Sequence, residues 1–222
     1  LRSILRASAH GSLKIMIPMI SSMEEILWVK EKLAEAKQQL RSEHIPFDEK
    51  IQLGIMLEVP SVMFIIDQCC EEIDFFSIGS NDLTQYLLAV DRDNAKVTRH
   101  YNSLNPAFLR ALDYAVQAVH RQGKWIGLCG ELGASKDFLP LLAGMGFDEL
   151  SMSSSAIPGV KHALRELNFA QCQQLAQNTL ALTRSSDVKT ALKNPSVKAT
   201  SKKAIIAPEF ILFHLDVADK NE

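Results

Sequence analysis

Four polar side chains follow the apolar run Phe75–Ile78, and they are the residues of this sequence best suited to chemistry. Asn81 and Asp82 come soon after the run, Gln85 follows them, and Arg92 stands ten residues beyond the carboxylate. Amide and carboxylate oxygens suit magnesium, and an arginine can bind a phosphate through two parallel hydrogen bonds. The spacing therefore predicts a magnesium-dependent phosphoryl-transfer site at the end of a buried strand.

A second carboxylate, Glu58, stands near the end of the apolar run Leu53–Val59. Burying a carboxylate there is costly unless a cation meets it. Together with Asp82 it would supply the one or two carboxylates that magnesium usually takes, with substrate oxygens and water completing the shell. The residue types alone leave another interpretation open, in which each carboxylate caps a helix or pairs with a nearby Lys or Arg. Arg92 has a similar alternative as a solvated residue of the charged stretch Asp91–Asp93.

Cys129 ends another apolar run and is followed by Gly130 and Glu131. A thiol loses its proton near neutral pH, so a cysteine at an active face can act as an acid. A lone buried cysteine is more often an inert apolar residue, and the residue type alone does not decide between the two roles. The remaining cysteines lack such a setting, and we expect packing or surface thiols at Cys69, Cys70 and Cys172.

The elements that position these side chains alternate along the chain. Strand-like apolar runs occupy Leu13–Met19, Leu53–Val59, Asp74–Ile78, Lys124–Cys129 and Glu149–Met152. Continuous apolar runs are typical of parallel strands covered on both faces. Helix-like stretches with helical apolar spacing or cap residues occupy Leu1–Ala9, Met23–Leu40, Asn105–Gln122, Ser135–Gly144, Ile157–Leu167 and Phe169–Leu182. Repeated β–α units predict an α/β fold, either an open doubly wound sheet or a closed (β/α)8 barrel.

The polar residues favour the barrel. Glu58, the pair Asn81 and Asp82, and Cys129 each lie at the C-terminal end of a different strand. A parallel barrel brings those ends to one face, whereas an open sheet confines such residues to the crevice at one switch point. The sequence thus predicts an incomplete TIM-type barrel of about five C-terminal β/α units, with three more units before Leu1.

The composition is that of an ordinary globular protein. The chain has 222 residues, of which 47% are apolar and 23% charged, with a net charge of −2 at pH 7. The near-neutral charge argues against a nucleic-acid-binding surface, and no apolar run is long enough to span a bilayer. Four cysteines without CxxC spacing favour reduced thiols in a cytoplasm. Because the chain starts at Leu1 and not at Met, we expect a piece of a longer protein.

The run Asp74–Arg92 resembles, at nearly every position, the signature of the phosphoenolpyruvate-utilising enzymes. That family includes Enzyme I of the bacterial phosphotransferase systems, pyruvate phosphate dikinase and phosphoenolpyruvate synthase. The resemblance covers about Leu1–Thr183 and implies the C-terminal part of a phosphoenolpyruvate-binding barrel, which we place in residues 1–184. Residues 185–222 form an unassigned tail, because Ser185–Lys203 has a linker-like composition and the apolar Ala204–Val217 resembles nothing in the family.

The resemblance also implies roles for the residues singled out above. Glu58 and Asp82 match the family's two Mg²⁺ ligands. Asn81, Asp82 and Arg92 match positions that bind phosphoenolpyruvate. Cys129, within Cys-Gly-Glu, matches the acid that protonates the methylene carbon when enolpyruvate becomes pyruvate.

The implied function is that of a phosphoenolpyruvate–protein phosphotransferase. Such an enzyme passes the phosphoryl group to its own histidine and then to a histidine-phosphocarrier protein, and its barrel domain commonly forms a homodimer. None of the chain's histidines lies in a motif resembling the phosphorylated one: His10, His44, His100, His120, His162 and His214. The wording of Gly79–Asp82 and Gln85–Leu88 favours the nitrogen-regulatory branch over the sugar branch. Two alternatives stay open, namely a dikinase or synthase, which needs a nucleotide-binding domain elsewhere, and a non-catalytic binding or dimerisation module.

Overall fold

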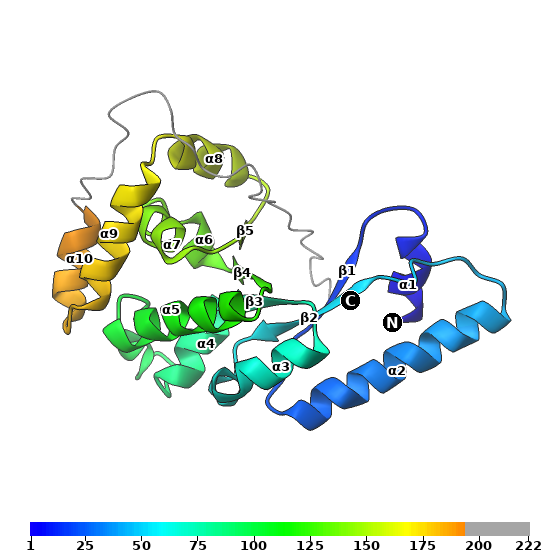
Figure 1. Ribbon diagram of the computed structural model, residues 1–222. Helices are drawn as coiled ribbons and strands as arrows, with labels where there is room; N and C mark the ends of the chain where they lie inside the picture. Colours follow the sequence, from blue (N-terminus) through cyan, green and yellow to red (C-terminus); the bar gives the residue numbers. More distant parts are fainter. Residues whose placement is uncertain (194–222) are drawn as a thin grey trace.

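A computed structural model describes residues 1–193 as an α/β structure built on one sheet of five parallel strands (Figure 1). The strands are β1 (Lys14–Ile17), β2 (Gln52–Leu57), β3 (Phe75–Gly79), β4 (Trp125–Cys129) and β5 (Glu149–Ser151). They lie side by side in the order in which they occur along the chain. A doubly wound sheet reverses its order at a switch point, whereas a barrel wall does not. The topology confirms the expected incomplete barrel.

Helices connect consecutive strands, as parallel pairing requires. The α-helices are α1 (Arg2–Ser8), α2 (Met23–Ser42), α3 (Ile66–Glu72), α4 (Ser80–Leu87), α5 (Pro106–Arg121), α6 (Glu131–Ala134), α7 (Leu139–Met145), α8 (Ile157–Arg165), α9 (Phe169–Leu180) and α10 (Ser185–Lys193), and the 3₁₀ turns are η1 (Pro60–Ile65) and η2 (Thr98–His100). Helix ends lie where the sequence provides caps. The backbone N–H of Ser22 donates to Glu25 Oε2 at 3.3 Å, and Asn105 Oδ1 accepts from the N–H of Ala107 at 2.8 Å.

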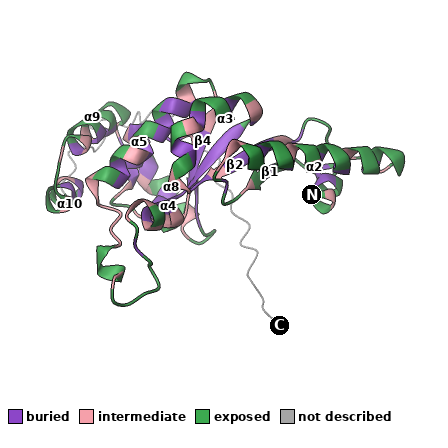
Figure 2. Cartoon of the chain, turned by 90° about the horizontal axis from the view of Figure 1, so that it is seen from below, coloured by how far each residue is buried: buried purple, intermediate pink, exposed green. Residues whose placement is uncertain are grey.

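One face of the sheet is buried under helices. Ile55, Phe76 and Ile126 stand side by side on β2, β3 and β4 and are almost fully buried. They belong to one apolar core with residues of α3, α5, α7 and α9, including Leu112 and Leu142. In Figure 2 the strands are correspondingly coloured as buried beneath partly exposed helices. Packing against this core fixes the orientation of the strands and, with it, the positions of their carboxyl ends.

The other face, which we call the inner face, carries Lys14, Gln52, Phe75, Trp125 and Glu149. Phe75 and Trp125 stack with ring centroids 4.5 Å apart, and Lys14 Nζ lies 5.8 Å from the Trp125 centroid. Lys14 is on β1 and Trp125 on β4, so a flat sheet would separate their backbones by about 14 Å. The approach of the two side chains therefore fits a sheet that curls toward its inner face, as a barrel wall does.

Two aspartates fix the register of neighbouring strands. Asp74, before β3, accepts from the N–H of Leu53 at 2.8 Å and donates its own N–H to the carbonyl of the same residue at 2.8 Å. Asp148, before β5, accepts from the N–H of Ile126 at 2.8 Å and donates to its carbonyl at 3.0 Å. Each aspartate thus fixes the register of its strand against the preceding strand. Both aspartates lie at the amino ends of the strands, opposite the carboxyl ends near Glu58, Asp82 and Cys129.

The structure corrects the sequence-based expectations for Ser185 onward and for Ser135–Gly144. The predicted linker from Ser185 begins instead with α10, whose Val188 and Leu192 are 0% and 4% exposed and belong to the main core. These two residues lie one helical turn apart, a short apolar stripe that the polar composition concealed. The predicted helix Ser135–Gly144 starts only at Leu139, as α7, and residues 135–138 form the break between α7 and the shorter α6 that precedes the predicted range. Ala204–Val217 lies outside the described residues.

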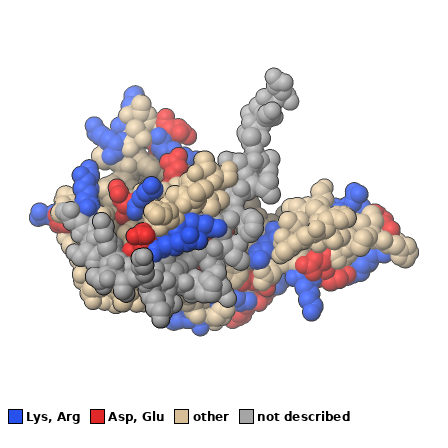
Figure 3. Space-filling model, turned by 90° about the horizontal axis from the view of Figure 1, so that it is seen from above, with Lys and Arg blue, Asp and Glu red and all other residues tan. Residues whose placement is uncertain are grey.

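Basic and acidic side chains are interspersed on the face shown in Figure 3. No helix within residues 1–193 has the length and apolarity needed to cross a membrane.

Candidate active site at the carboxyl ends of the strands

Glu58 and Asp82 meet at the carboxyl ends of β2 and β3. Glu58 follows β2 and is 2% exposed, and its Oε1 accepts the N–H of Met19 at 2.7 Å. Asp82 lies in the first turn of α4, immediately beyond β3. Burial raises the pKa of Glu58, the Met19 N–H opposes this, and the neighbouring Asp82 carboxylate raises the pKa further. The structure therefore brings together Glu58 and Asp82, the two carboxylates predicted from the sequence to bind one Mg²⁺ ion.

Gly79, the last residue of β3, leaves room for the Glu58 carboxyl group. A β-carbon at this position would clash with Glu58 Oε2 and lie 3.0 Å from both the Cβ of Glu58 and the Sδ of Met56. The φ of Gly79 is −77°, which any residue can adopt, so the backbone conformation does not require glycine. Glycine is needed because the Glu58 side chain lies so close to this position.

Arg92 is the cation beside these carboxylates. Its Nη2 lies 3.6 Å from Asp82 Oδ1, and both side chains are more than one-third exposed. The N–H of Arg92 donates to Gln85 Oε1 at 3.0 Å, which ties the loop after α4 back to that helix. An exposed pair at this distance contributes little to stability, so the guanidinium keeps donors available for an anion.

Asn81 is held by Tyr101, a residue that the sequence analysis missed. The Tyr101 hydroxyl donates to the carbonyl of Asn81 at 3.2 Å and lies 3.5 Å from its Oδ1. Burial raises the pKa of Tyr101; hydrogen bonding to Thr84 and the charge of Arg92 lower it, whereas Asp82 and Glu131 raise it. No pattern in the sequence links Tyr101 to the strand end twenty residues before it. Glu131 belongs to the Cys-Gly-Glu motif noted in the sequence, but the sequence analysis gave it no role in the site.

Cys129 ends β4 on the inner face. Its Sγ lies 3.3 Å from the carbonyl of Ile78, to which the thiol donates, and 4.0 Å from Met56 Sδ. Burial raises the pKa of the thiol, and the charges of Glu58 and Glu149 add to the rise, while a hydrogen bond from Ser77 lowers it. At neutral pH the group therefore carries the proton that an acid needs. The buried thiols that the sequence set aside have pKa values raised to about 11 and no active-site neighbours: Cys69, Cys70 and Cys172.

Gly130 allows the strand end that carries Cys129 to pack against the start of α4. Its φ is 110°, and a β-carbon would lie 2.6 Å from Ser80 Oγ and 3.6 Å from Asn81 Oδ1. The Ser80 hydroxyl in turn donates to the carbonyl of Cys129 at 2.8 Å. This hydrogen bond sets the distance between the cysteine and the Asn81–Asp82 pair.

The donor set suits a magnesium ion better than a transition metal. Within residues 1–193 no group of three or more His, Cys, Asp and Glu side chains could hold a metal ion. Magnesium does not require such a group, because it usually takes one or two carboxylates with water and substrate oxygens. A buried carboxylate whose charged form is disfavoured by an adjacent carboxylate is a fitting place for a divalent cation. The ligand roles of Glu58 and Asp82 nevertheless stay predictions.

Comparison with known proteins identifies the family. The family described as PEP-utilising enzyme, PEP-binding domain (where PEP is phosphoenolpyruvate) matches residues 1–169, and the chain belongs to it. It is 73% identical over 223 residues to multiphosphoryl transfer protein 2 of Escherichia coli K12, an alignment covering 100% of this chain and 26% of that protein. It is 44% identical over 194 residues to the phosphoenolpyruvate-protein phosphotransferase of Buchnera aphidicola subsp. Acyrthosiphon pisum, covering 87% and 34% of the two chains.

These alignments also bear on length, tail and fold. The chain spans about a quarter to a third of the length of these curated relatives. The first alignment includes the tail, so the expectation that Ala204–Val217 matches nothing in the family was wrong. A citrate lyase from Burkholderia xenovorans LB400 shares the fold alone, with a TM-score of 0.54, 15% identity, and coverage of 86% of this chain and 66% of that one.

Proposed function

We propose that this chain supplies the phosphoenolpyruvate-binding site of a phosphoenolpyruvate–protein phosphotransferase. The observation that carries the proposal is the convergence of Glu58, Asp82, Arg92 and a protonated Cys129 at the carboxyl ends of three neighbouring strands. An ion-binding carboxylate pair, an anion-binding cation and an acid are the parts that cleavage of an enol phosphate requires. The names of the relatives support this reaction over the alternatives.

Each residue has a defined task in the proposed reaction. Glu58 and Asp82 would hold Mg²⁺, and the ion would supply positive charge to neutralise the phosphoryl group. Asn81 and Arg92 bind and orient the substrate anion through the amide and the guanidinium. The phosphoryl group leaves for a histidine, and the enolate that remains takes the Cys129 proton onto its methylene carbon. The products are pyruvate and a thiolate at Cys129, which must regain a proton before the next turnover.

The proposal also includes the final phosphoryl acceptor and the oligomeric state. The acceptor beyond the histidine is a histidine-phosphocarrier protein, and the barrel forms a homodimer. A dikinase or synthase would use the same site but would add a nucleotide-binding domain, so the coding sequence before Leu1 separates the two readings.

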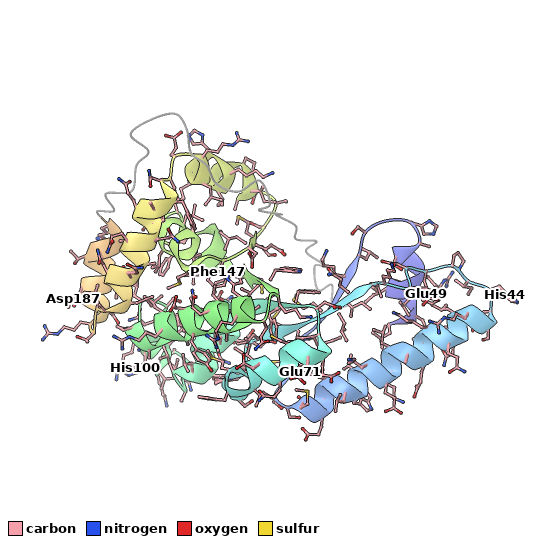
Figure 4. All side chains as sticks on the ribbon, viewed as in Figure 1. His44, Glu49, Glu71, His100, Phe147 and Asp187 are labelled. Carbon is pink, nitrogen blue, oxygen red and sulfur yellow. The ribbon has the colours of Figure 1, made fainter. Side chains whose placement is uncertain are left out.

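Magnesium binding tests the proposal on the chain itself. We expect Mg²⁺ to raise the midpoint of thermal unfolding in a concentration-dependent way, since a ligand that binds only the folded state stabilises it. Glu58→Gln and Asp82→Asn should abolish this rise. Glu71→Gln, on the outer surface of α3 (Figure 4), is a matched control that removes a charge elsewhere and should retain it. An equal rise in all four proteins would contradict the proposal.

A further inference from the structure

The loop between α4 and α5 brings two side chains to the site from its two ends. Residues 88–105 leave α4, form the turn η2 and lead into α5. Arg92 lies near the start of this loop and Tyr101 near its end. Residues 91–100 are exposed apart from the half-buried Val97, and Tyr101 is half-buried as well. The loop thus extends into solvent after Arg92 and returns to the protein at Tyr101.

The Tyr101 hydroxyl lies beside groups that the proposed reaction uses, although that reaction gives it no task. It donates to the carbonyl of Asn81 at 3.2 Å and lies 3.5 Å from Asn81 Oδ1. Burial raises the pKa of Tyr101, whereas hydrogen bonding to Thr84 and the charge of Arg92 lower it. The Asp82 carboxylate raises it. The hydroxyl is therefore close to the amide, the cation and one carboxylate of the site.

The amide of Asn81 has an oxygen side and a nitrogen side, and only the NH₂ group can donate to an anion. The oxygen lies on the side of Gly130, where a built β-carbon would be 3.6 Å from Oδ1 and 3.7 Å from Cγ. Because the nitrogen lies across Cγ from the oxygen, the NH₂ group faces away from Gly130. A tyrosine hydroxyl keeps its proton at neutral pH and donates it to an oxygen. Tyr101 therefore favours the orientation that leaves the NH₂ group free.

We propose that Tyr101 is a positioning residue for the substrate anion. Its hydroxyl holds the oxygen side of Asn81, so that the NH₂ group stays available to donate to the anion. The inference rests on the proposed function, in which Asn81 and Arg92 bind that anion. Tyr101 makes no contact with the substrate in this role and acts through Asn81. The same hydrogen bond closes the loop that carries Arg92 beside the amide.

Nuclear Overhauser effects in the folded 222-residue chain report the orientation of the amide without any ligand. Because Oδ1 is the amide atom nearest Gly130, the Asn81 Hδ2 protons should give only a weak cross-peak to the Gly130 Hα protons. Asn81→Asp removes the Hδ2 signals and so identifies them. In Tyr101→Phe the amide is free to turn over, and the cross-peak should grow about 5-fold, the factor that corresponds to one ordinary hydrogen bond. Tyr114→Phe removes an exposed hydroxyl on α5 and is the matched control, with an unchanged cross-peak.

Binding of phosphoenolpyruvate in the presence of Mg²⁺ is the second measurement, followed in the same spectra. The substrate should shift the Asn81 Nδ2 resonance of the wild-type chain. Tyr101→Phe should weaken the affinity for phosphoenolpyruvate about 5-fold, since the amide then spends less time in the donating orientation. The rise in unfolding midpoint with Mg²⁺ alone should persist in this variant, because Glu58 and Asp82 are unchanged. A purely structural role for the hydroxyl would weaken both kinds of binding.

The outcomes decide the proposal and separate it from the proposed function. A strong Gly130 cross-peak in the wild type, or an unchanged one in Tyr101→Phe, overturns it, because the hydroxyl would then not orient the amide. An unchanged affinity for phosphoenolpyruvate in Tyr101→Phe also overturns it. If Tyr101→Phe does not fold, the strength of the wild-type cross-peak decides alone. If phosphoenolpyruvate shifts no resonance of the wild-type site, the proposed function fails, while the ligand-free cross-peaks still decide whether Tyr101 orients the amide.

Discussion

At the scale of single residues, the site contains a carboxylate that is unfavourable in the metal-free chain. Glu58 is nearly inaccessible to water, and its Oε1 accepts a hydrogen bond from the backbone N–H of Met19. Its pKa is raised above 4.5 by burial and by Asp82. Folding therefore favours the protonated form. The stability that this group contributes is present below pH 4.5 and is lost as pH rises through the pKa of the folded state.

Glu58→Gln should consequently stabilise the metal-free chain at pH 7 and leave it unchanged at pH 4. The expected gain in the free energy of unfolding at pH 7 is about 1 kcal/mol, because the amide keeps an acceptor for Met19 but carries no charge. Urea unfolding of both proteins at the two pH values measures the difference. Glu71→Gln serves as the control, with the same result as wild type at both pH values. A loss of stability at pH 7 would show that Glu58 has a compensating partner.

The site residues that sequence reasoning found share one property. Glu58, Asp82 and Cys129 are polar side chains at the ends of apolar runs, where residue type alone makes them conspicuous. Tyr101 and Glu149 have no such marker. Tyr101 reaches the site from a long loop, and Glu149, whose charge raises the pKa of Cys129, comes near it only through the register that pairs it with Gly127. Both depend on contacts between elements, which a single sequence does not display.

At the scale of elements, the strands could be predicted more reliably than the short helices. Each of the five apolar runs overlaps one observed strand, because buried parallel strands require continuous apolar residues. The helices α3, α4, α6 and α10 are each nine residues or shorter and were missed. Helices of this length have too few turns for a clear period, and the packing that stabilises them comes from the rest of the fold.

Gly144 tests the packing of two such helices. It lies on α7, and a β-carbon there would clash with the carbonyl group of Cys172 on α9 and lie 3.0 Å from the backbone N of Gln173. Glycine in a helix interior normally costs about 1 kcal/mol relative to alanine. Gly144→Ala should nevertheless destabilise the chain by about 2 to 4 kcal/mol, because backbone atoms must move apart.

Thermal or urea unfolding measures this effect, and Gly11→Ala is the control. No atom lies within 4 Å of a β-carbon built on Gly11, so this variant should stay within about 0.5 kcal/mol of wild type. A stabilised Gly144→Ala variant would mean that α7 and α9 lie further apart than the structure shows.

The helix α10 provides a second test at this scale. Leu192→Ala should cost about 2 to 4 kcal/mol, since it removes a side chain that belongs to the main core. Lys189→Ala, on the exposed side of the same helix, should have little effect. If both variants behaved alike in urea unfolding, the original boundary at residue 184 would describe the folded unit better than one that includes α10.

At the scale of the whole molecule, the sequential strand order and the curl of the sheet place the carboxyl ends around one site. They also leave polar and aromatic groups, among them Lys14, Trp125 and Glu149, on the inner face. A barrel wall of this kind can present ligands and an acid, but phosphoryl transfer needs an acceptor as well. Figure 4 shows His44 beyond the end of α2. His120 is occupied by Asp148, with its Nε2 2.8 Å from the carboxylate.

We therefore expect the 222-residue chain, mixed with phosphoenolpyruvate and magnesium, to release no pyruvate above a protein-free blank. By the family resemblance, none of the chain's histidines lies in a motif like that of the phosphorylated histidine. A coupled lactate dehydrogenase assay measures the release, with a phosphoenolpyruvate-protein phosphotransferase and its phosphocarrier protein as the positive control. Pyruvate formation that disappears in Cys129→Ser would contradict the expectation, because the ligands and acid assembled here would then suffice with water as the acceptor. Release that persists in that variant would indicate a contaminating activity, since the proposed acid would have been removed.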